Sequence, residues 1–247
     1  TRPARLCPHP LLRPSPEPMV MVSPASQSLH VAGFGCVRNG RVLLRHINFE
    51  LASGQLLLLQ GGNGTGKSTL LRSMAGLMHW RAGTLRWCGQ VMSARNPLFQ
   101  QQLAYLGHQC AMHDALSGAE NLRYALQLQG IAWQAERAHQ VLQQLQVLHV
   151  AQRPLGRLSQ GQRRRMALAR VLLSDRPLWL LDEPDNALDV DGSALLAQIL
   201  AAHAQAGGMA VVVSHRGIAT PDVPCQILNL NPPSSALQRE EGACSVL

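Results

Sequence analysis

Three continuous apolar runs and three stretches of helical spacing alternate along much of this chain. The apolar runs predict strands that are buried on both faces, and they occupy residues 56–59, 178–181 and 210–213. Apolar residues that recur every three or four positions predict helices over 68–78, 161–173 and 191–205. Buried strands that alternate with helices indicate an α/β fold with a parallel core sheet.

Two further regions have a different pattern of residues from this core. Residues 29–60 alternate short apolar runs with turn signals such as Asn39-Gly40, which predicts antiparallel strands joined by hairpins. Residues 94–157 are rich in Gln and Leu, and Val141, Leu142 and Leu145 lie at helical spacing. We therefore predict an antiparallel β part ahead of the parallel sheet and a helical part, at about 94–160, inserted into it.

The two ends of the chain are expected to lie outside this domain. Residues 1–28 contain seven prolines and three arginines, and proline at this density prevents a helix or a central strand. We expect a disordered extension, or one that precedes a true start at Met19 or Met21. Residues 231–247 have no clear pattern and are expected to form a flexible tail. This leaves 29–230 as one domain.

A glycine-rich segment joins the first buried strand to the first long helix. Residues 61–68 read GGNGTGKS, which fits the pattern G-x-x-x-x-G-K-[ST] of phosphate-binding loops. Glycines let backbone N–H groups turn toward phosphates, and the following helix presents its positive N-terminus to the same anion. We expect Lys67 to contact the β- and γ-phosphates and the Ser68 hydroxyl to ligate Mg²⁺. The predicted phosphate-binding residues are Gly61, Gly62, Asn63, Gly64, Thr65, Gly66, Lys67, Ser68 and Thr69.

Two acidic residues, Asp182 and Glu183, follow the buried strand predicted at 178–181. The carboxyl end of a parallel strand lies at the ligand-binding edge of an open α/β sheet. We expect Asp182 to hold Mg²⁺ through water and Glu183 to orient or deprotonate the attacking water. An isolated Asp-Glu pair is more often a helix cap or a solvated pair. This pair, however, ends a buried strand in a chain that has a phosphate loop.

A second segment of small residues opens the helix predicted at 161–173. Residues 158–162 read LSQGQ, and a helix N-terminus with small residues suits an anion. Because the segment lies outside the phosphate loop, it can complete a site only across an interface. With the phosphate loop and the two acids, it resembles the hallmark motifs of ATP-binding cassette (ABC) ATPases.

The resemblance implies a three-part ABC nucleotide-binding domain that binds Mg-ATP and hydrolyses it. It also implies a face-to-face dimer, in which Ser159, Gly161 and Gln162 contact the nucleotide held by the opposite subunit. Each ATP then lies between one subunit's phosphate loop and the other subunit's LSQGQ segment. The free energy of dimer closure comes from γ-phosphate contacts that ADP cannot make.

The same resemblance assigns roles to residues whose surroundings alone would mean little. Gln109 stands where the family has a glutamine that senses Mg²⁺ and the membrane partner, and His215 where it has a histidine that contacts the γ-phosphate. The run NALD at 186–189 resembles the family's D-loop. Family members often stack an aromatic residue on adenine. Here Arg38 stands near that position, and its guanidinium plane could stack on the base.

Charge and composition narrow the choice of partners. The net charge of +8 and the pI near 10.0 fit nucleic acid, an anionic membrane face or an anionic nucleotide. Aromatic residues make up only 4%, which argues against a surface that stacks on bases. The three arginines at 163–165 are expected to be the solvated start of a helix. No apolar run approaches the roughly 18 residues that span a bilayer, so we expect a soluble or peripheral protein.

Within the ABC family the chain resembles the ATP-binding subunits of haem exporters that serve cytochrome c maturation. The runs that carry this resemblance include CVRNGRVLL at 36–44, ELASG at 50–54, LGHQ at 106–109, QRRRMALAR at 162–170 and DVDG at 189–192. That group usually has Phe-Thr where this chain has Asp185-Asn186. The resemblance implies a second cassette, most simply another copy of this chain, and an integral membrane subunit of the haem-exporter type. It implies no nucleic-acid partner and a place on the cytoplasmic face of the bacterial inner membrane.

Two other functions fit the same motifs. The chain could be the cassette of another exporter, for lipid, peptide or drug, and the membrane subunit that co-purifies with it would separate the two. It could also be an ABC ATPase that acts on nucleic acid or ribosomes. Such proteins commonly carry two cassettes, zinc inserts or long coiled coils. This sequence has none of these, and its six cysteines form no Cys-x-x-Cys pair.

Overall fold

The computed structural model describes residues 27–38, 41–79, 82–215, 217–218, 220 and 222–230. The predicted extension at 1–28, apart from its last two residues, and the predicted tail at 231–247 lie outside this range. So does the turn predicted at Asn39-Gly40. None of the described helices is long and apolar enough to cross a membrane.

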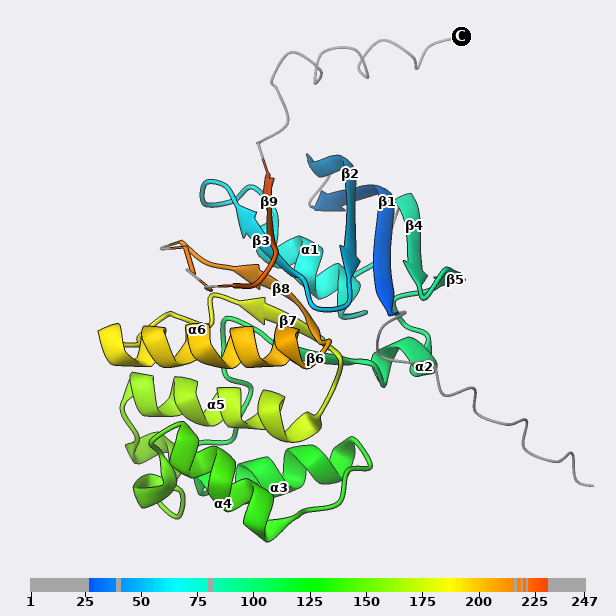
Figure 1. Ribbon diagram of the computed structural model, residues 1–247. Coiled ribbons are helices and arrows are strands. Elements are labelled where there is room, and N and C mark those ends of the chain that lie inside the picture. The colour runs from blue at the N-terminus through cyan, green and yellow to red at the C-terminus, as the bar shows by residue number, and fades with distance from the viewer. Residues whose placement is uncertain are drawn as a thin grey trace, which may run out of the picture.

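A five-stranded parallel sheet forms the centre of the molecule (Figure 1). Its order is β6 (Leu103–Leu106), β7 (Leu178–Asp182), β8 (Met209–Val213), β3 (Leu56–Gln60) and β9 (Cys225–Asn229). The strands β7 and β8 are buried at every position, and β3 is buried at four of its five. Their continuous apolar sequences follow from this burial, since both faces of the sheet are covered. The predicted parallel core is confirmed.

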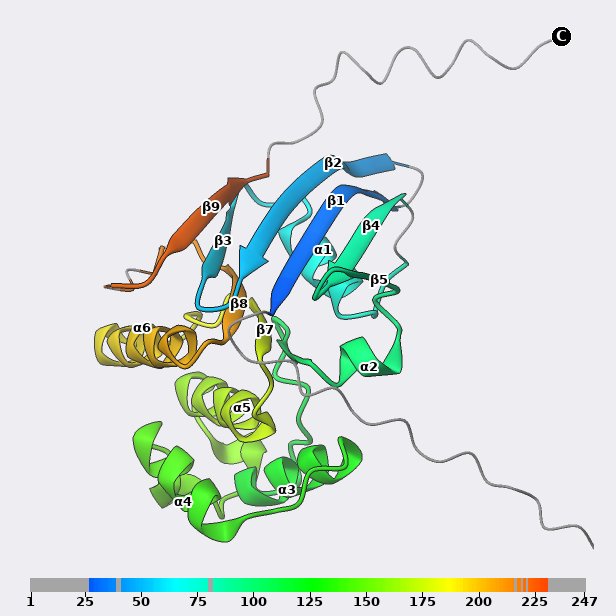
Figure 2. The same ribbon diagram turned by 45° about the vertical axis from the view of Figure 1, so that its right-hand side comes forward.

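A second sheet, antiparallel and four-stranded, packs beside α1 (Lys67–Met74), as Figure 2 shows. Its order is β2 (Arg41–Ala52), β1 (Ser28–Arg38), β4 (Ala82–Trp87) and β5 (Gln90–Met92). One hydrophobic cluster joins this sheet to α1 and to one face of the parallel sheet, and it includes Phe34, Leu70 and Leu57.

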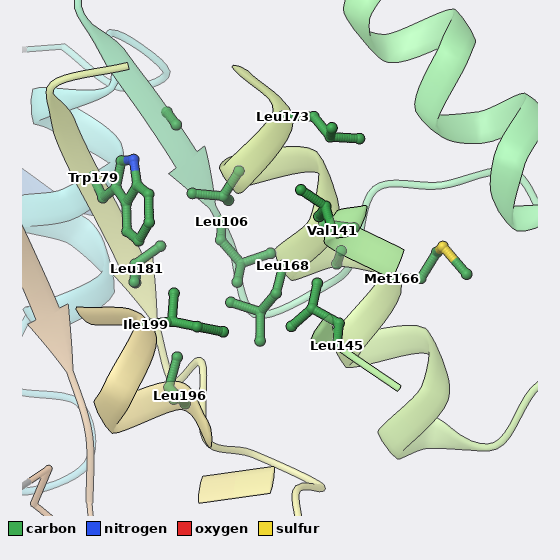
Figure 3. Close-up of a cluster of buried hydrophobic side chains, with 14 of the residues drawn as sticks. Leu106, Val141, Leu145, Met166, Leu168, Leu173, Trp179, Leu181, Leu196 and Ile199 are labelled. Atoms are coloured by element: carbon green, nitrogen blue, oxygen red, sulfur yellow. The ribbon is translucent and has the colours of Figure 1, made fainter. Parts of the chain in front are cut away.

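Helices cover the other face of the parallel sheet (Figure 1). α5 (Gln160–Ser174) and α6 (Val190–Gln205) lie against it, and α3 (Gly118–Leu128) and α4 (Ala135–Gln144) lie beyond α5. Figure 3 shows the cluster between these layers, where Leu181 of β7 and Ile199 of α6 lie near Leu168 of α5. Successive residues of β3 alternate between the two clusters, because Leu57 belongs to the first and Leu58 to this one.

One strand of the parallel sheet arises from the region predicted to be helical. β6 has the sequence LAYL and pairs in parallel with β7 at the edge of the sheet. The short helix α2 (Pro97–Gln100) and the 3₁₀ turns η2 (Leu148–Val150) and η3 (Leu155–Arg157) also lie in this region. A run of four residues is too short for periodicity to separate a strand from a buried helical turn. The strand matters for the site, because it leads directly into His108 and Gln109.

Candidate active site

The phosphate loop, the two acids and His215 meet at one edge of the parallel sheet. β3 leads into the glycine-rich loop, β7 ends at Asp182, and His215 follows β8 by two residues. These three strands are neighbours in the sheet, so their carboxyl ends lie together. A pocket of about 550 Å³ opens there. Its lining includes Asn63, Gly64, Gly66, Lys67, Ser68, Thr69, Arg72, Glu183 and His215.

Lys67 is buried within the glycine-rich loop, with 6% of its surface exposed. Its ammonium donates to the carbonyl oxygens of Gly61 and Gly62, at 2.7 and 2.8 Å. The Thr65 hydroxyl also donates to the Gly62 carbonyl, at 3.0 Å. The N-cap of α1 is Gly66, which has a φ of 101°, and none of the described side chains caps the helix. The N–H groups of its first turn are therefore left for an anion.

Ser68 and Asp182 form the pair expected to hold the metal. The Ser68 hydroxyl donates to Asp182 Oδ1 at 2.9 Å. Asp182 is fully buried, and its second oxygen, Oδ2, has no hydrogen-bond partner among the described residues. Burial raises the pKa of Asp182, while the hydrogen bond from Ser68 acts to lower it. A buried carboxylate oxygen without a partner, next to a hydroxyl, fits Mg²⁺, which prefers oxygen ligands and keeps several waters.

Glu183 turns away from β7 in a left-handed backbone conformation, with a φ of 53°. Such a conformation is uncommon for a residue other than glycine, and strained backbone of this kind gathers at functional sites. The amide of Glu183 donates to the carbonyl of Val213 at 2.9 Å, which fixes it to β8. Its Oε1 lies 3.0 Å from Nε2 of His215, the histidine predicted at this site. Its Oε2 lies 3.2 Å from Nδ1 of His108, a residue to which no pattern in the sequence assigns a role.

The LSQGQ segment forms the N-terminus of α5, far along the chain from the phosphate loop. Ser159 is the N-cap, its hydroxyl accepts from the Gln162 amide at 3.2 Å, and the Gln162 side chain accepts from the Ser159 amide at 3.0 Å. Gly161 lies against the D-loop, since a Cβ there would come within 2.9 Å of the Ala187 carbonyl. A pocket is lined by all three of these LSQGQ residues, and in the described part of the chain it shares no residue with the phosphate pocket.

For two predicted residues the described part of the chain shows no contact with this site. Gln109 is exposed, and no hydrogen bond of its side chain is seen within the described ranges. Arg38 is the last residue of β1, and its side chain lies outside the described part of the structure. Their roles toward Mg²⁺ and adenine stay predictions.

Arg164 corrects the prediction that the three arginines at 163–165 are solvated, because it is only 4% exposed. Its guanidinium donates to the carbonyls of Asp182, Glu183 and Gly107, at 2.5, 2.6 and 2.8 Å, and also to that of Pro184. Helical spacing explains the burial: 167, 168 and 171, which lie three, four and seven positions on, are all buried. Backbone carbonyls satisfy the buried cation, whose burial lowers the pKa of Arg164.

Comparison with known proteins agrees with this geometry. The family model described as ABC transporter matches residues 44–186. A curated "Cytochrome c biogenesis ATP-binding export protein CcmA" from Bordetella bronchiseptica is 46% identical over 180 residues, which cover 73% of this chain and 79% of that protein. The protein of the same name from Cupriavidus necator is 41% identical over 208 residues, which cover 81% and 92%.

Solved structures show the same fold. A putative ABC transporter ATP-binding protein from Pyrococcus furiosus superposes with a TM-score of 0.72 at 22% identity, covering 82% of this chain and 97% of that one. An ATP-binding cassette of an ABC transporter in its ADP conformation gives 0.65 at 18% identity, covering 76% and 81%. The chain therefore belongs to the ABC transporter family and, within it, to the group of cytochrome c biogenesis ATP-binding export proteins.

Proposed function

We propose that two copies of this chain bind two ATP molecules between them and hydrolyse them to drive a separate membrane subunit of a haem exporter. Membership of its group makes the chain an ATP-hydrolysing subunit of a transporter in cytochrome c biogenesis. Beyond this membership we propose the dimer, the bound Mg²⁺, the membrane partner and haem as the transported species. The observation that carries it is a single pocket lined by both Lys67 and Glu183.

The phosphates of ATP bind at the open N-terminus of α1. Lys67 exchanges the two loop carbonyls that it now contacts for oxygens of the β- and γ-phosphates. Mg²⁺ held by Ser68 and Asp182 would offset the negative charge that builds up on the phosphates. Glu183 orients the attacking water and accepts its proton, and His215 lies beside it to contact the γ-phosphate.

The second copy supplies the LSQGQ segment. Within one chain this segment lines a different pocket from the phosphate loop, so both can contact one nucleotide only when another chain brings its own. We assign the trans contacts to Ser159, Gly161 and Gln162. In this arrangement the γ-phosphate joins the two subunits, and its release after hydrolysis opens the dimer.

The membrane subunit places the dimer on the cytoplasmic face of the bacterial inner membrane. The net charge of +8 favours an anionic surface, and the curated relatives are named as export proteins of cytochrome c biogenesis. A cassette of a lipid, peptide or drug exporter would co-purify with a different membrane subunit. Affinity purification of the full chain from its own cells separates these functions, since only the proposed complex would carry haem and sustain assembly of c-type cytochromes.

The variant Glu183→Gln tests the enzymatic mechanism. It keeps the shape of the side chain and removes the base, so we expect ATP affinity within about twofold of wild type and turnover lower by about 100-fold or more. Because ATP is bound and not consumed, the variant should form a dimer that depends on ATP, which light scattering measures. Glu136→Gln, at an exposed position of α4, is the matched control. Normal turnover in Glu183→Gln would refute the assigned role.

A further inference from the structure

The carboxylate of Glu183 lies between two imidazoles that come from different segments. His215 follows β8 and contacts Oε1, whereas His108 follows β6 and contacts Oε2. The side chain of Glu183 is 22% exposed, and those of His108 and His215 are 55% and 47% exposed. Each oxygen of the expected general base therefore has its own imidazole contact, at the rim of the phosphate pocket.

A buried anchor fixes the place of His108 relative to Glu183. Arg164 donates to the Gly107 carbonyl, one residue before His108, and to the Glu183 carbonyl itself. The same guanidinium therefore holds the backbone of both residues, and it is almost wholly buried. Gly107 is tightly packed as well, because a Cβ there would lie 3.0 Å from the Tyr105 hydroxyl. The contact between His108 and Glu183 is thus made by side chains whose backbones are both tied to one buried guanidinium.

We propose that His108 is a positioning residue for ATP hydrolysis, which holds the Glu183 carboxylate in the orientation from which it acts on water. The inference rests on the proposed role of Glu183. A carboxylate that is restrained at one oxygen can still rotate about its terminal torsion, whose energy profile is broad. A second contact at the other oxygen limits this rotation. An ionised carboxylate has about four acceptor sites, so two contacts leave sites for the water.

Substitutions at His108 test the proposal by separating the rate of hydrolysis from nucleotide binding. His108→Ala removes the contact, and we expect kcat to fall by about 10-fold, because small errors in the position of a reacting group cost large factors in rate. The Kd for Mg-ATP and the KM should stay within about twofold, since His108 is not among the residues that line the phosphate pocket. In His108→Asn the amide nitrogen takes the place of Nδ1, and kcat should recover to within about threefold of wild type.

Two controls separate positioning from a structural effect. His108→Phe keeps a ring and removes the donor, so its kcat should stay as low as that of the alanine variant. His139→Ala, at an exposed position of α4, should leave kcat unchanged. All variants are measured in the full chain by steady-state ATP hydrolysis and fluorescent-nucleotide titration.

The outcomes also separate this inference from the proposed function. Normal turnover in His108→Ala beside an inactive Glu183→Gln overturns the positioning role alone. The positioning role is also overturned if His108→Phe is as active as His108→Asn, or if weaker ATP binding explains the loss of activity. Normal turnover in Glu183→Gln overturns the general base and the role of His108 with it.

Discussion

The ABC motifs mark two helix N-termini, which differ in how a single chain satisfies their free N–H groups. At α1 the N-cap is Gly66, and none of the described side chains accepts from the helix's first N–H groups. At α5 the side chains of Ser159 and Gln162 cap each other's amides. One terminus is left open for a ligand, whereas the other is closed by its own residues.

The cations near the two termini differ in the same way, because one is available to an anion and the other is already paired. Lys67 projects into the phosphate loop, and its hydrogen bonds within the described part of the chain go to neutral carbonyls, so its charge can meet an anion. Arg165 lines the pocket beside Ser159, but it pairs with Asp189 at 2.8 Å and donates to Gln146. A paired cation attracts a further anion weakly. This difference supports the proposal that nucleotide affinity lies mainly at α1, with α5 contributing when a second chain presents a bound nucleotide.

Two substitutions test this difference between the termini, and Lys67→Ala should have the larger effect. Removal of a charged donor from a buried phosphate site costs about 3 kcal/mol, and we expect ATP affinity to fall by about 100-fold or more. Titration with a fluorescent nucleotide measures it. Unchanged affinity would show that the open terminus is not the main binding site.

The sequence offers two sharp controls for this prediction. Lys67 is the only lysine in the chain, which otherwise uses arginine. Lys67→Arg keeps the charge, yet a planar guanidinium is larger than the ammonium that fits between two carbonyls, so affinity should fall here too. In the wild type, an amine-specific reagent can modify only this side chain and the chain's amino terminus. ATP should protect Lys67 from that reagent, as peptide mass spectrometry would show.

The features that the sequence alone can predict are those that follow from a local pattern. The buried strands are short apolar runs, and the phosphate loop is a contiguous motif. Arg164 and His108 have no such pattern of their own. The burial of Arg164 is satisfied by carbonyls from two distant segments that converge on it, and His108 meets Glu183 because the edge strand β6 pairs with β7. Helical spacing could have placed Arg164 on the inner face of α5. No spacing in the sequence predicts the contact between His108 and Glu183.

Ser159→Ala tests the closed terminus and should have smaller effects. Loss of the N-cap lowers the free energy of unfolding by about 1 kcal/mol. Loss of one neutral hydrogen-bond partner for the opposite nucleotide should slow hydrolysis by about fivefold. ATP affinity at low protein concentration should stay unchanged, because the open terminus at α1 is intact.

Ser117→Ala is the matched control for Ser159→Ala, because Ser117 and Glu120 form the same kind of capping box at the start of α3. Ser117 lines neither of the two pockets that the motifs mark. We therefore expect the same loss of stability, measured by urea unfolding, with normal hydrolysis once the protein is folded. Equal effects of the two variants on hydrolysis would mean that Ser159 acts only as a helix cap. Slower hydrolysis in Ser159→Ala alone would assign its hydroxyl a part in completing the site of a second chain.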